Sequence, residues 1–81
     1  MPRKLKTLSG DQIIRFFCML GFFITRTKGS HIRLCRKIDS GDQLLTIPRH
    51  KVVPKGTIKA IYNQAGVFIE RQTLDKFFYT R

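Results

Sequence analysis

The sequence predicts an α+β fold in which two helices cover one face of a three-stranded antiparallel sheet. Apolar residues recur at helical spacing before residue 21 and again after Pro54. Between these segments, residues 22–47 form three β-rich runs separated by short turns, which is the pattern of a meander. At 81 residues, the chain is expected to form a single domain with the order helix, strand, strand, strand, helix.

The first helix is predicted to begin near Ser9, after a basic segment. Residues 1–7 contain three cations and little apolar content, so we expect them to form a flexible basic arm. Ser9 and Gln12 fit a capping box, in which each side chain satisfies the backbone amide of the other. Gly21 is expected to end the helix, whose buried stripe consists of Ile13, Phe16, Phe17 and Leu20.

Three strands joined by short turns follow the first helix. The first strand is predicted over residues 22–27, which are rich in aromatic and β-branched side chains. Residues 28–30 then form a tight turn, and residues 31–36 return as the second strand. A turn at residues 39–42 leads to the third strand, over residues 43–47.

Alternation along the second strand predicts which side chains face the core. Ile32 and Leu34 are expected to point inward, because apolar side chains two apart share one face of a sheet. His31, Arg33 and Cys35 are then expected on the opposite, outward face.

A second helix is predicted over residues 57–64, with its cap at Thr57 or just before it. Gly66 is expected to end this helix, whose apolar side is formed by Ile58, Ile61 and Ala65.

Residues 67–81 form a C-terminal extension that the sequence leaves open to two interpretations. Residues 67–69 fit a fragment of strand. The positions after Thr73 fit a short helix, with an apolar side of Leu74, Phe77 and Phe78.

The predicted α-β-β-β-α sandwich has the architecture of double-stranded-RNA-binding domains, and the composition also favours a polyanionic partner. Sixteen Lys and Arg against five Asp and Glu give a net charge of +11. Such an excess favours association with a polyanion through the release of counterions. Nucleic acid is the leading partner class, and an acidic protein or an anionic membrane surface are the alternatives.

No membrane segment, metal centre or cofactor is expected from the sequence. The longest apolar run, residues 13–24, is interrupted by Arg15 and Gly21 and is too short to span a bilayer. Cys18 and Cys35 lack metal-ligand spacing, so we interpret them as reduced thiols of a cytoplasmic protein.

Two histidines among cations are the candidate functional residues. His31 follows the turn at residues 28–30, and His50 lies between Arg49 and Lys51. Imidazole transfers protons near neutral pH, and RNA supplies its own nucleophile as the 2′-hydroxyl group. We therefore predict metal-independent RNA cleavage with His31 as general acid or base. Phosphate contacts are expected from Lys28, Ser30, Arg33, Arg49, His50, Lys51 and Lys55. The residues alone leave open a second interpretation, in which His31 is a surface histidine that hydrogen-bonds the turn.

Several short motifs occur in the order and spacing of one known protein family. The most specific are Lys28-Gly29-Ser30-His31 and the later pair Lys55-Gly56-Thr57 and Gln64-Ala65-Gly66. Between residues 8 and 66 they are joined by Leu8-Ser9-Gly10, Leu20-Gly21-Phe22 and Ile47-Pro48-Arg49-His50. In these motifs the chain resembles the HicA-type toxins, the messenger-RNA interferases of HicA–HicB toxin–antitoxin systems.

The resemblance implies a double-stranded-RNA-binding-like fold, metal-independent cleavage of messenger RNA, and catalysis by His31. It also implies a HicB-type antitoxin as protein partner. The chain departs from the family at Ile32, where many members have a second histidine, and after Gly66, where its extension is longer and more aromatic. The alternative functions are a non-catalytic RNA-binding module of the same fold and a basic subunit that docks on an acidic protein.

Overall fold

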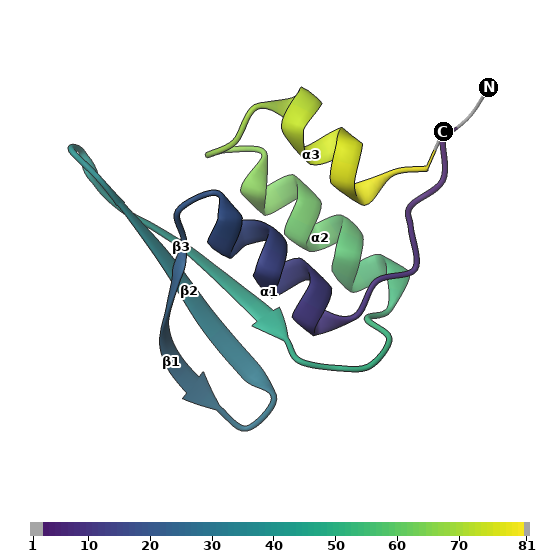
Figure 1. The fold of residues 1–81 in the computed structure, drawn as a ribbon, viewed down its shortest axis with the longest axis horizontal. Helices are drawn as coiled ribbons and strands as arrows, with labels where there is room; N and C mark the ends of the chain where they lie inside the picture. The colour runs from purple at the N-terminus through teal and green to yellow at the C-terminus, as the bar shows by residue number, and fades with distance from the viewer. Residues whose placement is uncertain (1–2, 81) are drawn as a thin grey trace.

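The computed structural model describes residues 3–80 and has the predicted α+β architecture. Three helices lie together on one side of a three-stranded sheet (Figure 1). Within residues 3–80, no helix combines the length and the apolar character that crossing a lipid bilayer requires. The elements in chain order are α1 (Gly10–Met19), β1 (Phe23–Lys28), β2 (His31–Ile38), β3 (Gly41–Pro48), α2 (Lys55–Ala65) and α3 (Arg71–Phe78).

Helix α1 begins with the predicted capping box. The Gln12 amide donates to the Ser9 hydroxyl at 3.1 Å, and the Ser9 amide donates to the Gln12 side-chain oxygen at 2.8 Å. Both bonds satisfy amides that have no partner within the first turn of a helix. The chain leaves α1 through Gly21, whose φ of 99° is a conformation that glycine adopts without strain.

The sheet is antiparallel with the strand order β1-β2-β3, so β2 lies at its centre. Strands β1 and β2 are joined by the two-residue loop Gly29–Ser30, in which Gly29 has a φ of 59°. Glycine at the first position of a two-residue loop is typical of tight hairpins. Strand β1 is an edge strand, and all six of its residues are exposed.

The predicted alternation of β2 is confirmed, but at its fifth position the side chain on the outward face is buried. Ile32 and Leu34 are fully buried, while His31 and Arg33 are exposed. Cys35, which the alternation placed outward, is only 3% exposed. Its cross-strand neighbours on the same face are Phe23 and Leu44, and these larger apolar side chains flank the small thiol on both sides. Burial at this position therefore comes from the neighbouring strands and not from the helices.

Helix α2 begins at Lys55, two residues before the predicted start. Pro54 occupies the N-cap position with a φ of −55°, and no side chain caps the helix. The earlier start follows from proline, which has the backbone angle of a helix already fixed. The side of α2 that faces the core contains Ile58, Ile61, Tyr62 and Ala65.

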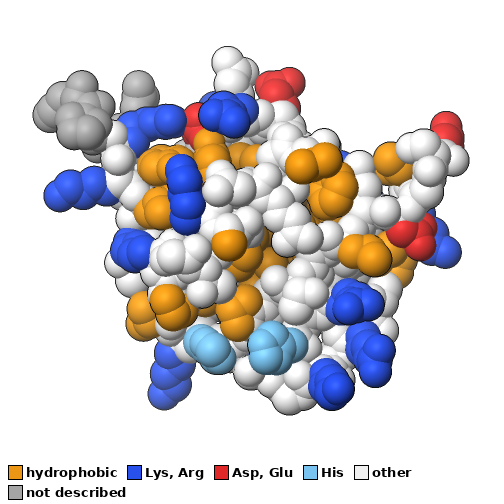
Figure 2. Space-filling model, turned by 180° about the vertical axis from the view of Figure 1, so that it is seen from behind, with side chains coloured by type: hydrophobic (Ala, Val, Ile, Leu, Met, Phe, Trp, Pro, Cys, Tyr) orange, Lys and Arg blue, Asp and Glu red, His pale blue; other side chains and the backbone are white. Residues whose placement is uncertain are grey.

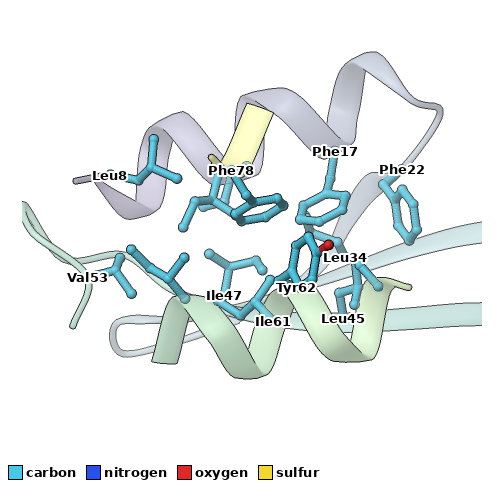
Figure 3. Close-up of a cluster of buried hydrophobic side chains, with 14 of the residues drawn as sticks. Leu8, Phe17, Phe22, Leu34, Leu45, Ile47, Val53, Ile61, Tyr62 and Phe78 are labelled. Carbon is cyan, nitrogen blue, oxygen red and sulfur yellow. The ribbon is translucent and has the colours of Figure 1, made fainter. Parts of the chain in front are cut away.

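The C-terminal extension forms a helix and contributes to the core. Helix α3 begins at Arg71, slightly before the predicted position, and residues 67–69 form a turn and not a strand. Leu74 and Phe78 of α3 are buried in the main apolar cluster. Figure 3 shows Phe78 among the side chains of α1 and α2, and its ring centroid lies 5.7 Å from that of Tyr62.

The segment predicted as a basic arm runs along the end of the chain. The Lys6 amide donates to the carbonyl oxygen of Phe78, and the Thr80 amide donates to that of Lys4, each at 2.8 Å. Leu5 and Tyr79 form an antiparallel bridge. Residues 3–7 are thus bound to the C-terminal segment, whereas the sequence predicted a flexible arm; Met1 and Pro2 lie outside the described residues.

Candidate nucleic-acid interface

The outward face of the sheet contains a cationic hollow beside the β1–β2 turn. The hollow has a volume of about 520 Å³. We call it the sheet hollow; it is lined by Arg26, Lys28, Gly29, His31, Arg33 and Thr46. Each of the lining residues is exposed. No carboxylate lines the hollow, so its electrostatic potential is set by cations.

The strand register explains why these side chains gather. His31 pairs with Lys28 of β1, and two residues further along the same face Arg33 pairs with Arg26. On the other side of β2, Arg33 pairs with Thr46. Directly opposed residues in an antiparallel sheet have Cβ atoms about 5 Å apart. The imidazole of His31 is therefore presented to solvent with guanidinium and ammonium groups around it.

The loop after β3 joins this region at the turn. Pro48 pairs with His31 across the sheet, and the Arg49 amide donates to the carbonyl oxygen of Ser30 at 2.6 Å. The His50 carbonyl oxygen in turn accepts a hydrogen bond of 2.8 Å from the Gly10 amide. These bonds fix the loop between the β1–β2 turn and the start of α1. Figure 2 shows the two histidine side chains next to each other on one face, with Lys and Arg side chains on both sides of them.

Gly10 is required for this close approach. A Cβ atom added at Gly10 would lie 2.2 Å from the carbonyl oxygen of Pro48 and 2.7 Å from the Cα atom of Arg49. Both distances are shorter than any tolerated contact, and both partners are backbone atoms. The Leu8-Ser9-Gly10 motif therefore positions the loop that contains His50 as well as starting α1.

Most of the predicted site residues lie in or beside the sheet hollow. Lys28, His31 and Arg33 line it, and Ser30 belongs to the adjoining turn. The loop after β3 presents Arg49, His50 and Lys51, all of them exposed.

Lys55 lies apart from the sheet hollow. Its ammonium group donates to the carbonyl oxygen of Leu5 at 2.6 Å and to the Thr7 hydroxyl at 3.4 Å. Thr46 lines the hollow although it was not among the predicted contacts. Extending the alternation of β2 to the third strand would have indicated it.

The Arg49 side chain is held by an ion pair at the surface. Its Nε atom lies 2.8 Å from a carboxylate oxygen of Asp11, and the side chains are 52% and 65% exposed. Exposed pairs of this kind contribute about 0–1 kcal/mol. A phosphate group can therefore compete for this guanidinium at little cost.

No metal centre is apparent in the part of the chain that the structure describes. Within residues 3–80, no three residues among His, Cys, Asp and Glu come close enough together to hold a metal ion. Cys18 is exposed, Cys35 is buried, and both are free thiols.

Comparison with known proteins gives one match. A family model described as the HicA toxin of bacterial toxin–antitoxin systems matches residues 10–67. This range includes the sheet hollow and the loop after β3. Comparisons with curated proteins and with solved structures gave no match.

Proposed function

This chain belongs to the HicA family of bacterial toxin–antitoxin toxins, and we propose that it is an endoribonuclease that cleaves messenger RNA without a metal ion. The observation that carries the proposal is the position of His31. Its imidazole is exposed on the sheet face opposite the helices, in a hollow with three cationic side chains. This is the arrangement that a general acid or base acting on a ribose–phosphate backbone requires.

In the proposed reaction His31 transfers the proton of the 2′-hydroxyl group. The 2′-oxygen attacks the adjacent phosphorus, the O2′–P bond forms and the P–O5′ bond breaks. The products are a 2′,3′-cyclic phosphate and a 5′-hydroxyl end, which takes up one proton. No oxidant, reductant or added nucleophile is needed for this balance.

The cations around His31 are assigned to the phosphate. Arg26, Lys28 and Arg33 stabilise the extra negative charge that develops in the transition state. His50, Arg49 and Lys51 contact neighbouring phosphates from the loop after β3, and such contacts give affinity without reading the base sequence.

The position of Ile32 supports a mechanism with one histidine in the turn motif. Ile32 is completely buried beneath the sheet. A side chain at this position points away from the sheet hollow, so it cannot contact an RNA that is bound beside His31. The second half of the proton transfer then has three alternatives, which are water, His50 and a leaving group assisted by a cation.

The family match supports a protein partner, and from it we propose the partner's type and the location. As a toxin-antitoxin toxin, the chain pairs with an antitoxin; we propose that this antitoxin is of the HicB type and that both act in the cytoplasm. The acidic character expected of such a partner would complement the net charge of +11.

The test compares the parent protein with the variants His31→Ala and His50→Ala on a labelled single-stranded RNA. For His31→Ala we expect cleavage to fall by about 10²–10⁴-fold, because a proton-transfer group is lost, with RNA binding largely retained. For His50→Ala we expect weaker binding and near-normal cleavage at saturating RNA. Cleavage by the parent should persist in EDTA.

Three results would overturn this assignment. Full cleavage by His31→Ala would exclude His31 as the proton-transfer group. Inhibition by EDTA that magnesium reverses would exclude the metal-free reaction. Binding of RNA by the parent without any cleavage would favour the non-catalytic RNA-binding module.

A further inference from the structure

A second cationic hollow lies where the two ends of the described chain meet the start of α2. Its volume is about 480 Å³. We call it the arm hollow; it is lined by Arg3, Lys4, Leu5, Lys55, Lys59 and Tyr79. We propose that the arm hollow binds RNA phosphates and extends the path of the RNA backbone beyond the sheet hollow. The identity of the polyanion rests on the proposed function.

The charge of the arm hollow is strongly unbalanced. Four of its six lining side chains are cationic and none is acidic. Asp75, outside the lining, pairs with Arg3 at 2.7 Å and neutralises one of the four charges. The remaining cations repel one another in the unbound protein, and a phosphate group placed among them would relieve that repulsion.

An aromatic ring holds the cations in place. The Arg3 guanidinium carbon lies 4.6 Å from the centre of the Tyr79 ring. The Lys59 ammonium group donates to the Tyr79 hydroxyl at 2.8 Å and lies 5.0 Å from the centre of the Tyr62 ring. Cation–π contacts fix the direction of a charge without neutralising it. These contacts therefore orient Arg3 and Lys59, and they do not themselves cancel either charge.

The start of α2 adds to the same positive potential. Lys55, the first residue of α2, uses its ammonium group to bind the Leu5 carbonyl oxygen. An ammonium group has three donors, so a phosphate oxygen can still be bound. No acidic residue lies in the first turn of α2, and no side chain caps it. The positive end of the helix dipole is thus not offset locally.

A loop with three consecutive exposed basic side chains runs from the sheet hollow toward the arm hollow. The loop after β3 leaves the sheet at Pro48, which pairs with His31, and reaches α2 at Lys55. Along the way it presents Arg49, His50 and Lys51 to solvent.

The arm hollow lies only partly within the matched family region, which contributes Lys55 and Lys59. Arg3, Lys4 and Tyr79 lie outside residues 10–67. The hollow exists because Leu5 and Tyr79 form a β-bridge. This bridge places the first described residues next to the last ones.

The experiment measures RNA affinity across a salt series in a His31→Ala background, so that cleavage does not interfere. Lys4→Gln and Lys59→Gln each remove one cation of the arm hollow. For a single-stranded RNA of about 16 nucleotides we expect each variant to lower the salt slope by about 0.7 and to weaken binding severalfold. Lys59→Arg, which keeps the charge, should restore binding.

Lys37→Gln is the matched control. Lys37 is exposed and lies near the far end of the β2–β3 hairpin, where it pairs with Asp42. We expect this variant to bind RNA like the parent. An RNA of about 4 nucleotides, at the lower end of single-stranded site sizes, should discriminate less between the parent and the arm-hollow variants. Unchanged thermal unfolding of Lys4→Gln would show that the fold is intact.

Equal weakening by Lys4→Gln and Lys37→Gln would overturn the proposal, because the effect would then be one of net charge. Normal RNA binding by Lys4→Gln and Lys59→Gln, with loss of binding to an acidic protein, would also overturn it and assign the arm hollow to that protein. If the parent binds RNA through Lys4 and Lys59 but cleaves none, the arm hollow stands and the nuclease assignment fails.

Discussion

At the scale of single residues, Gly10 links the start of α1 to the loop that contains His50. We expect Gly10→Ala to destabilise the fold by about 1–3 kcal/mol, because the added methyl group meets backbone atoms that cannot move aside. The displaced loop should also weaken RNA binding. Denaturant unfolding and RNA titration measure the two effects.

Gly56→Ala provides the control for this substitution. A Cβ atom at Gly56 meets nothing within 4 Å, and the residue lies in α2. Alanine is the better helix former, so the change should be neutral or stabilising by up to about 1 kcal/mol. If Gly10→Ala were equally harmless, the close approach described above would not constrain the loop.

The burial and exposure of single residues could be predicted wherever the spacing along one strand determines them. The alternation of His31, Ile32, Arg33 and Leu34 was enough to place two side chains in the core and two in the sheet hollow. The burial of Cys35 could not be obtained in this way, because it depends on which residues of β1 and β3 stand beside it.

At the scale of elements, α3 shows that the C-terminal extension is part of the fold. We expect Phe78→Ala to cost about 3–5 kcal/mol, since this ring is fully buried between α1 and α2. Thermal or denaturant unfolding measures the loss. Val67→Ala, in the same extension but 81% exposed, should change stability by no more than about 0.5 kcal/mol. A similar cost for both variants would contradict the integration of α3 into the core.

The helices and strands were largely predictable because each has its own pattern. The capping box of α1 and the meander were both confirmed. The choice between strand and helix after Gly66 was not decided by pattern, because Leu74 and Phe78 acquire their roles only through contact with α1 and α2. The early start of α2 shows that proline at the N-cap position outweighed the capping preference of Thr57.

At the scale of the whole molecule, a polar network joins the beginning of the described chain to α2 and α3. Arg3 and Tyr62 both donate hydrogen bonds to Asp75. The bond from Arg3, followed by that from Tyr62, lowers the pKa of Asp75 below its ordinary value of 3.8. The hydrogen bond to Asp75 and burial raise the pKa of Tyr62 above its ordinary value of 10.0.

This network predicts a loss of stability at both extremes of pH. The Asp75 contribution is complete above pH 3.8 and is lost progressively as the pH falls from there through the lower folded-state pKa, where the carboxylate becomes protonated in the folded state too. The Tyr62 contribution is complete below pH 10.0 and is lost as the pH rises above it. Unfolding by denaturant across a pH series, compared between the parent and Asp75→Asn, tests the acid limb. Parallel pH profiles for the two proteins would contradict it.

The arm hollow could not be predicted from the sequence, because its cations come from positions that are far apart in the chain. Arg3 and Tyr79 have no local pattern that relates them, and Lys55 was assigned to the histidine region from its motif alone. The composition predicted a polyanionic partner. It could not predict that the cations gather in two hollows, because the arm hollow forms only where Leu5 pairs with Tyr79.

The bridge between Leu5 and Tyr79 has a practical consequence for anyone who attaches a reporter to this protein. A fluorescent or affinity domain attached directly at residue 3 or at residue 80 would lie beside the arm hollow and crowd it. With the exposed Cys18 replaced by serine, a dye on a cysteine introduced at Ser40 stands instead on the β2–β3 tip, beyond the far end of a strand about 23 Å long that begins at His31. Labels on that tip leave both cationic surfaces open.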